Sequence, residues 1–271
     1  MYASIHTTKG AAMTFINPLK QMLREGRLTA GAWAQLASPV TAEILSEAGF
    51  DWILVDLEHG PGDVATLVAQ VQAIKGTGAV PLARAPWNDL VVIKRMLDTG
   101  ICGLVIPYVN TAEEARAAVR ACRYPPQGIR GVAASPRAHG YGQRAGDYFR
   151  QANEQLLIIT QVETPTAVEN VDSILEVEGL DGVFIGPMDL ATNMGFLGNP
   201  ADPAVQHAMR QVESRVKASG KVLGTIASGW QEAQALYDRG YQMVTLMADG
   251  TALAAVAAEL VRQFHIYRPA A

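Results

Sequence analysis

The sequence predicts a single-domain α/β protein, a (β/α)₈ barrel, and three observations lead to this prediction. Short apolar runs rich in β-favouring residues recur eight times along the 271 residues. Segments with helical periodicity lie between most of these runs. The runs are apolar along nearly their whole length, which is typical of parallel strands covered by helices. Eight such units close into a barrel that carries its active site at the carboxyl ends of the strands.

The predicted strands begin at the following runs, in chain order: AGAWAQL at 30, WILVDLE at 52, VPLARAP at 80, GLVIPYV at 103, LLIITQVE at 156, GVFIGP at 182, KVLGTIA at 221 and QMVTLMAD at 242. Three of the intervening helices have recognisable starts. Ser38 and Thr164 each precede a proline, and Thr111 is followed by Glu114 three residues on, which is the spacing of a capping box.

Composition excludes several classes of protein. The chain has 22 basic and 26 acidic residues with no basic cluster, so we expect no nucleic-acid partner. No apolar run approaches the roughly 20 residues of a membrane span, and the first 20 residues lack the apolar core of a signal peptide. We therefore expect a cytoplasmic protein, with a flexible leader at 1–14 before the barrel domain at 15–271. Cys102 and Cys122 are interpreted as buried free thiols, in preference to a disulfide or a nucleophile.

Two segments are longer than a barrel helix requires. Residues 124–155 and 190–203 are rich in proline and glycine, and we expect both near the loops that carry the chemistry of a barrel. Lids or subunit contacts are the functional interpretation. Surface insertions without function are the alternative.

Polar residues close four of the predicted strands. They are Asp56, Glu58 and His59 after the second strand, Arg84 after the third, Gln161 and Glu163 after the fifth, and Asp189 after the sixth. No lysine is among them. All six lysines lie in the leader, in helices or at the start of the seventh strand, namely Lys9, Lys20, Lys75, Lys94, Lys217 and Lys221. A Schiff-base mechanism is therefore not expected.

Glu163 and Asp189 lie at the ends of consecutive strands and should face the same mouth of the barrel. Two unpaired carboxylates there would repel each other. A divalent cation resolves the repulsion, because Mg²⁺ or Mn²⁺ accepts two carboxylates together with substrate oxygens and water. The alternative is that each acid caps the helix that follows it.

Arg84 and His59 are the predicted reactive groups beside this pair. An interior arginine is costly unless an anion faces it. It could neutralise Glu163 and Asp189 structurally, or it could bind a substrate oxygen that becomes negative during reaction. His59 is interpreted as a general base, with a hydrogen-bonded loop residue as the alternative. His139 is a weaker candidate for the base.

Several motifs, in order along the chain, resemble one family. They are FDWILVDLEHGPGD, ARAPWND, RYPPQGIRGV, QVET and DGVFIGPMDLATNMGFLGNP. The chain resembles the HpcH/HpaI family of metal-dependent (class II) pyruvate aldolases, which includes 4-hydroxy-2-oxoheptanedioate aldolase and 2-dehydro-3-deoxyglucarate aldolase. The resemblance covers about residues 15 to 265 and implies a hexamer built from dimers.

The resemblance also implies roles for single residues. His59 corresponds to the base, Arg84 to the transition-state stabiliser, Gln161 to a substrate contact, and Glu163 and Asp189 to the metal ligands. Asp98 corresponds to an acid that raises the basicity of the histidine. Because Asp98 closes the helix before the fourth strand, it belongs at the far end of its own barrel. Action in the site of a neighbouring chain is therefore the alternative to action within its own chain.

The turn Gly186–Pro187 would let the chain pass close to a small ligand, so that the amides of Met188 and Asp189 meet a carboxylate. Met188 departs from the small residue usual in the family, and the end of the eighth strand also differs. Both departures affect the edge of the pocket.

We therefore predict a carbon–carbon lyase that reversibly cleaves a 4-hydroxy-2-oxo acid to pyruvate, or a close analogue such as hydroxypyruvate, and an aldehyde. The expected course is a metal-stabilised enolate with Mg²⁺ or Mn²⁺, and Co²⁺ as a further option. Such an enzyme fits the catabolism of aromatic compounds or sugar acids. The alternatives are cleavage of an acyl-CoA, as in the β-chain of citrate lyase and malyl-CoA lyase, and a non-catalytic barrel that serves as a binding protein.

Overall fold

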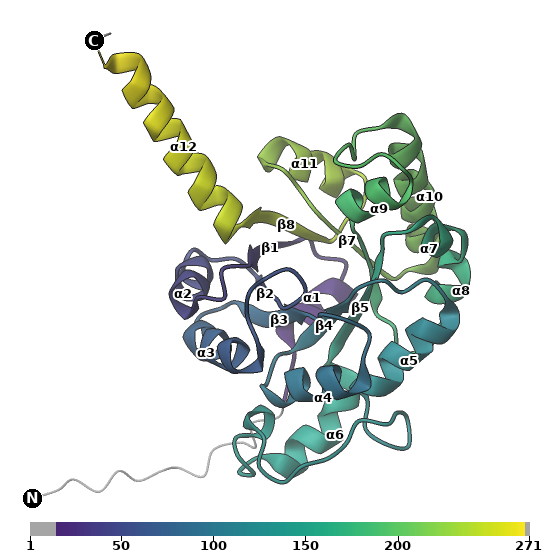
Figure 1. Cartoon of the computed structure of the whole chain (residues 1–271). Coiled ribbons are helices and arrows are strands. Elements are labelled where there is room, and N and C mark those ends of the chain that lie inside the picture. The colour runs from purple at the N-terminus through teal and green to yellow at the C-terminus, as the bar shows by residue number, and fades with distance from the viewer. Residues whose placement is uncertain (1–14, 269–271) are drawn as a thin grey trace, which may run out of the picture.

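Eight parallel strands form a closed barrel in chain order in the computed structural model, which describes residues 15–268 (Figure 1). The strands are β1 (Thr29–Ala34), β2 (Trp52–Asp56), β3 (Val80–Arg84), β4 (Gly103–Ile106), β5 (Leu157–Val162), β6 (Gly182–Ile185), β7 (Val222–Ile226) and β8 (Met243–Ala248). Each of the eight predicted strands is present, and the predicted (β/α)₈ barrel is confirmed. The predicted leader at 1–14 lies outside the described residues.

Helices surround the barrel, and most of them cover its outer face. They are α1 (Pro18–Arg24), α2 (Pro39–Glu47), α3 (Val64–Ile74), α4 (Leu90–Asp98), α5 (Ala112–Cys122), the short 3₁₀ helix η1 (Arg137–His139), α6 (Ala145–Gln155), α7 (Pro165–Glu169), α8 (Val171–Leu175), α9 (Pro187–Asn193), α10 (Pro203–Ser219), α11 (Trp230–Asp238) and α12 (Asp249–Tyr267). All three predicted helix starts are confirmed: Ser38 and Thr164 are N-caps followed by proline, and Thr111 forms a capping box with Glu114.

Large rings fill the barrel interior because glycines on adjoining strands leave room for them. A Cβ at Gly31 would come within 2.3 Å of the Trp52 ring, and one at Gly224 within 2.7 Å of the Phe184 ring. Both rings are fully buried. The interior is therefore a packed core, and only its upper layer, at the carboxyl ends of the strands, remains for a site.

The opposite end of the barrel is closed by α1. Leu19 and Leu23 pack into the interior cluster of the barrel. Between them Lys20 is buried, and its Nζ donates to Asp181 Oδ2 at 2.8 Å and to the Leu156 carbonyl at 2.7 Å. The polar contacts of Lys20 thus hold α1 at the end of the barrel, with Leu19 and Leu23 packed into the interior.

One of the two long segments lies at the end of the barrel opposite to the one we predicted. Residues 124–155 follow α5 and precede β5, so the loop before α6 lies at the amino ends of the strands. Arg137 in this loop donates to the Thr99 carbonyl, just beyond the C-terminus of α4. The segment was misplaced because its length was clear from the sequence, whereas its position depends on where the preceding helix ends. Residues 190–203 do lie beyond β6, partly as α9.

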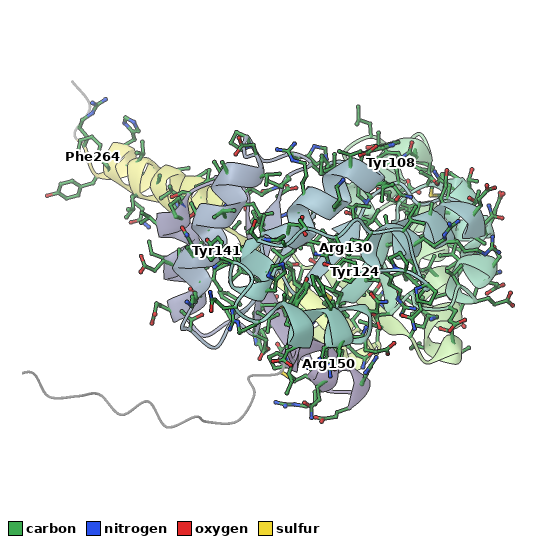
Figure 2. The ribbon with its side chains drawn as sticks, turned by 90° about the horizontal axis from the view of Figure 1, so that it is seen from below. Tyr108, Tyr124, Arg130, Tyr141, Arg150 and Phe264 are labelled. Carbon is green, nitrogen blue, oxygen red and sulfur yellow. The ribbon has the colours of Figure 1, made fainter. Side chains whose placement is uncertain are left out.

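The last helix does not cover its own barrel. Figure 1 shows α12 leaving the end of β8 and projecting away from the other helices, and Figure 2 shows Phe264 far out along it. Its apolar side chains are exposed, including Leu253 at 64%, Val256 at 61% and Phe264 at 55%. A 19-residue helix with these side chains in water is an incomplete arrangement for one chain.

Two expectations from composition concern the cysteines and membrane-spanning helices. Cys122 is a buried free thiol, as predicted, whereas Cys102 is a free thiol that is only partly buried. Burial raises the pKa of each to about 12. Over residues 15–268, no helix is long and apolar enough to cross a membrane.

Candidate active site

One cavity at the carboxyl ends of the strands collects seven of the nine predicted site residues. Its volume is about 300 Å³. The lining consists of Trp33, Gln35, His59, Arg84, Gln161, Phe184, Gly186, Pro187, Met188, Asp189, Ile226 and Ala248. Glu163 and Asp98 are the two predicted residues that do not line it.

Arg84 is held by acids of the neighbouring strand. Asp56 and Arg84 are register partners on β2 and β3, and Arg84 Nε and Nη2 donate to the two Asp56 oxygens at 2.9 and 2.6 Å. Nη1 lies 2.8 Å from Glu58 Oε2, and the guanidinium carbon lies 4.5 Å above the Trp33 ring. The partners of Arg84 are therefore Asp56 and Glu58, and not Glu163 and Asp189 as in the structural alternative.

Asp56 joins the two reactive segments of the site. It is 1% exposed, and besides Arg84 it accepts hydrogen bonds from Gln35 Nε2 and from the backbone N–H groups of Glu58 and His59. Burial raises the pKa of Asp56, but the hydrogen bonds and charge of Arg84 outweigh burial and hold the pKa below its usual value. Asp56 thus stays ionised and fixes the arginine and the start of the histidine loop together.

Glu58 is a second partner of Arg84 that the sequence interpretation left without a role. Burial raises its pKa to about 7, the Arg84 charge opposes this rise, and the charges of Asp56 and Asp189 add to it. Alternation along the strands could have indicated the link to Arg84, because positions 52, 54 and 56 of β2 and positions 80, 82 and 84 of β3 all face inward.

Glu163 lies beneath the cavity floor. Its Oε1 accepts from the Tyr108 backbone N–H at 2.7 Å, and its Oε2 accepts from Gln161 Nε2 at 2.5 Å. Tyr108 reaches this position with φ of +53°, a left-handed conformation that non-glycine residues rarely adopt. The cap of α7 is Thr164, whose side chain accepts from Ala167 N–H, so the capping alternative for Glu163 is wrong.

The floor is thin because residue 186 is a glycine. A Cβ there would come within 2.7 Å of Glu163 Oε2 and 3.3 Å of Gln161 Nε2. The chain then turns at Pro187 into α9, which places Asp189 in the first helical turn, half-buried and on the cavity wall. Glu163 therefore lies against Gly186, and Asp189 lies in the helical turn that follows this glycine.

The charges of this region fit a divalent cation. Burial, together with the charges of Glu58 and Asp189, raises the pKa of Glu163 to about 7 despite the Tyr108 hydrogen bond. Burial is the main cause of this shift and the neighbouring acids add to it, and a bound dication would favour the ionised form of Glu163. Among the described residues no three His, Cys, Asp or Glu side chains are arranged to hold a metal ion. A cation bound at Glu163 and Asp189 would therefore need substrate oxygens and water to complete its coordination.

The two candidate histidines have different surroundings. His59 is exposed at the cavity rim, where a base could reach a substrate. His139 is 1% exposed, accepts from Gly142 N–H at Nδ1, and has Nε2 3.2 Å from the Ala133 carbonyl. Since both ring nitrogens are engaged and the ring does not line the cavity, His139 is a structural residue.

Asp98 lies apart from the cavity, at the end of α4. Its Oδ1 accepts from Arg130 Nη2 at 2.9 Å. Arg130 is fully buried, donates to the Tyr148 hydroxyl, and packs over the Tyr124 ring at 4.5 Å (Figure 2). The structure therefore does not bring Asp98 and His59 of one chain together.

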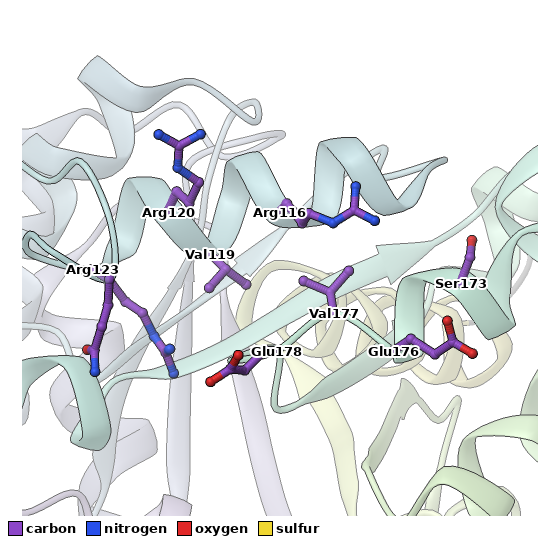
Figure 3. A pocket seen from close by; sticks show the side chains of 9 residues that line it. Arg116, Val119, Arg120, Arg123, Ser173, Glu176, Val177 and Glu178 are labelled. Atoms are coloured by element: carbon purple, nitrogen blue, oxygen red, sulfur yellow. The ribbon is translucent and has the colours of Figure 1, made fainter.

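A second groove, of about 530 Å³, lies outside the barrel between α5 and the end of α8 (Figure 3). Arg116, Arg120 and Arg123 face it from one side and Glu176 and Glu178 from the other. Figure 3 shows Arg120 pointing away from both glutamates, so the arginines do not converge on one point. No predicted site residue lines this groove.

Comparison with known proteins now assigns the barrel. Residues 29–255 match the family model described as HpcH/HpaI aldolase/citrate lyase. The chain belongs to this family. It is 46% identical over 235 residues to 5-keto-4-deoxy-D-glucarate aldolase of Salmonella arizonae, a match that covers 87% of this chain and 91% of that protein.

Solved structures agree with the family. A member from Burkholderia cenocepacia is 36% identical with a TM-score of 0.88, and the match covers 92% of this chain and 99% of that one. The β subunit of citrate lyase from Mycobacterium tuberculosis is 13% identical with a TM-score of 0.54, covering 83% and 93%, and shares the fold alone. The protein is thus a carbon–carbon lyase of the aldolase type, and family members of this type depend on a divalent metal.

Proposed function

We propose that this enzyme reversibly cleaves a 4-hydroxy-2-oxo acid into pyruvate, or a close analogue such as hydroxypyruvate, and an aldehyde. The observation that carries the proposal is the single cavity in which Arg84, Gln161 and Asp189 meet above the buried Glu163. This set matches a small 2-oxo acid, which offers a keto oxygen and a carboxylate.

Glu163 and Asp189 would hold Mg²⁺ or Mn²⁺, with Co²⁺ as a further option. A bound divalent cation supplies Lewis acidity, which makes the methyl group of a 2-oxo acid easier to deprotonate. Gln161 fixes the Glu163 carboxylate by its hydrogen bond. The first turn of α9 leaves the backbone N–H groups of Met188 and Asp189 without partners inside the helix, so they can donate to the substrate carboxylate.

Arg84 and His59 would carry the charge and proton steps. Asp56 and Trp33 fix the guanidinium plane, and Arg84 has N–H groups left to donate to the oxygen that gains charge as the carbon–carbon bond breaks. In cleavage His59 takes the proton of the 4-hydroxyl group, and in the reverse direction it returns that proton.

The functional protein would be a homo-oligomer in which α12 docks on a second copy of the chain. An apolar groove of about 690 Å³ lies between α10, α11 and the start of α12, where a barrel helix would normally pack. The exposed apolar side chains of α12 suit such a groove, and exchange between two copies would bury both. A hexamer of such dimers is the assembly we propose.

A second contact between copies would bring Asp98 to His59. Ile129 and Val132, in the loop that carries Arg130, are exposed apolar residues near the amino ends of the strands. Trp87 and Val91, exposed near the site end, offer a complementary apolar surface. A head-to-tail contact would place the carboxylate that Arg130 anchors beside the histidine of the next chain. A cytoplasmic location and a catabolic pathway stay predictions.

The test is exchange of the methyl protons of pyruvate in D₂O, followed by NMR. Exchange should require added Mn²⁺ or Mg²⁺ and stop with excess chelator, and borohydride should not trap pyruvate on the protein. Exchange that continues in chelator, or a trapped adduct, would contradict the proposal.

A further inference from the structure

Asp189 depends on its main chain for its position, unlike Glu163. Both carboxylate oxygens of Glu163 accept hydrogen bonds, from the Tyr108 backbone N–H and from Gln161 Nε2. Within residues 15–268, the hydrogen bond that a side chain donates to Asp189 goes to its main-chain carbonyl, and none goes to its carboxylate. Because Asp189 lies in the first turn of the seven-residue helix α9, the place of this carboxylate follows from how α9 is held.

Asn193, the last residue of α9, links the two acids directly. Its side-chain Nδ2 donates to the Asp189 main-chain carbonyl at 2.9 Å and to the Glu163 main-chain carbonyl at 3.1 Å. One amide nitrogen has two N–H groups and can therefore hold both carbonyls at once. In the part of the chain that the structure describes, this is the only hydrogen bond that joins α9 to residues 163–170, the segment beyond β5.

The link lies where three strand ends meet. Tyr108 follows β4, Glu163 follows β5, and Asn193 ends the helix that follows β6. The Tyr108 hydroxyl lies 3.5 Å from Asn193 Nδ2. Burial of Leu190 and Ala191 also attaches α9 to the barrel. Apolar burial is not directional, however, whereas a hydrogen bond fixes a distance and an angle.

We infer that Asn193 is a positioning residue that holds Glu163 and Asp189 at the separation that a divalent cation needs. The inference rests on the proposed function. Mg²⁺ demands near-ideal octahedral geometry, so two carboxylates whose main chains can drift apart should bind it less tightly. Asn193 does not line the cavity, so it acts through the two acids and not by contact with the substrate.

The chain offers a matched control on the same helix. Thr192 is exposed like Asn193, and its Oγ1 donates to the Met188 carbonyl four residues back, as Asn193 donates to Asp189. Thr192→Ala therefore removes a contact within α9 alone, whereas Asn193→Ala also removes the link to Glu163. Asn193→Leu keeps a branched side chain of similar size but has no donor.

Calorimetric titration of the full-length protein with Mn²⁺, in the presence of pyruvate, measures the effect. Asn193→Ala and Asn193→Leu should bind Mn²⁺ about tenfold more weakly than the wild type, because a group that orients a metal ligand is lost. Thr192→Ala should bind like the wild type. The melting temperatures of the metal-free proteins should agree within about 2 °C, since both positions are exposed. Methyl-proton exchange of pyruvate should recover at saturating Mn²⁺, because affinity and not the chemical step is impaired.

Mn²⁺ binding of wild-type strength in both Asn193 variants would overturn the inference and leave the proposed function standing. An equal loss in Thr192→Ala, or a loss that accompanies a lower melting temperature, would have the same consequence, because it would reflect damage to α9 as a whole. Exchange that stays low at saturating Mn²⁺ would also contradict a positioning role. If the wild type binds no Mn²⁺, or if Glu163→Gln binds it equally well, the proposed metal site and the inference fall together.

Discussion

The two ends of the barrel treat buried charge in opposite ways. At the amino ends of the strands, each buried cation has one acid: Lys20 pairs with Asp181, and Arg130 pairs with Asp98. At the carboxyl ends, Arg84 contacts two acids, Asp56 and Glu58, and two more acids, Glu163 and Asp189, lie near enough for charges within this group to raise the pKa of neighbouring carboxyl groups. Balanced pairs serve structure, whereas an excess of one sign needs a ligand to complete it. The difference locates the site independently of the shape of the cavity.

The largest expected loss of activity comes from removing an acid that we assign to the metal. Glu163→Gln or Asp189→Asn should lower pyruvate release by about 10³-fold or more, because the enolate loses its main stabilisation. Calorimetric titration with Mn²⁺ should show the matching loss of metal affinity. Glu176→Gln, in the groove outside the barrel, is the matched control and should bind metal normally. Normal Mn²⁺ binding by both site variants would refute the assignment.

Removal of the single cation at the carboxyl ends should have the next largest effect. Arg84→Ala should lower kcat by about 10²–10³-fold, equivalent to about 3–4 kcal/mol. It should also lower the melting temperature, because Asp56 and Glu58 lose their partner. Arg84→Lys keeps the charge without the planar fork and should be impaired less. A folded Arg84→Ala protein with near-normal kcat would exclude the catalytic role.

Removal of a cation at the opposite end should change stability alone. Lys20→Met should lower the free energy of unfolding by about 2 kcal/mol, because Asp181 is left without its partner. Urea unfolding measures this loss, and kcat should stay within about twofold. Lys75→Met, at an exposed position, is the control and should unfold like the wild type. A large loss of kcat in Lys20→Met would show that the two ends are not independent.

The stability of the metal-free protein should depend on pH because several acids lie at the carboxyl ends of the strands. The pKa of Glu58 and of Glu163 is raised to about 7 in the folded chain, so the folded state binds more protons than the unfolded state between about pH 4.5 and 7. Stability should therefore fall as pH rises through this window, by several kcal/mol for the two groups together. Thermal unfolding in chelator measures the effect, and Glu163→Gln should reduce the slope. An upward slope would contradict the assigned shifts.

The smallest expected signal comes from mixed oligomers. His59→Ala and Asp98→Ala chains should each be weakly active, and mixing them should restore a minor part of the activity. Recovery is expected because some interfaces would join an intact His59 to an intact Asp98. If mixed oligomers form and no activity returns, Asp98 serves its own chain through Arg130 and not the neighbouring site.

The sequence was sufficient to predict the strands and to predict that seven of the proposed site residues share one end of the barrel, because these depend on local patterns. The strand that ends at Asp189 is recognisable from three apolar residues between glycines, and Ser38 is recognisable as a cap from its proline. The partners of Arg84 were not predictable in the same way, because they depend on the register that aligns Asp56 with it. Similarly, whether α12 packs on its own barrel depends on the direction in which the chain leaves β8, which no local pattern encodes.

Gly186 and Met188 lie two residues apart and differ completely in their freedom to change. Any side chain at 186 would collide with the carboxylate of Glu163, whereas Met188 is 51% exposed and faces the open side of the cavity. Selection can therefore vary residue 188 without disturbing the acid beneath its neighbour. A short turn of this kind places a position that cannot accept a side chain directly beside one that can change, so the mouth of the cavity can vary while the backbone over Glu163 is retained.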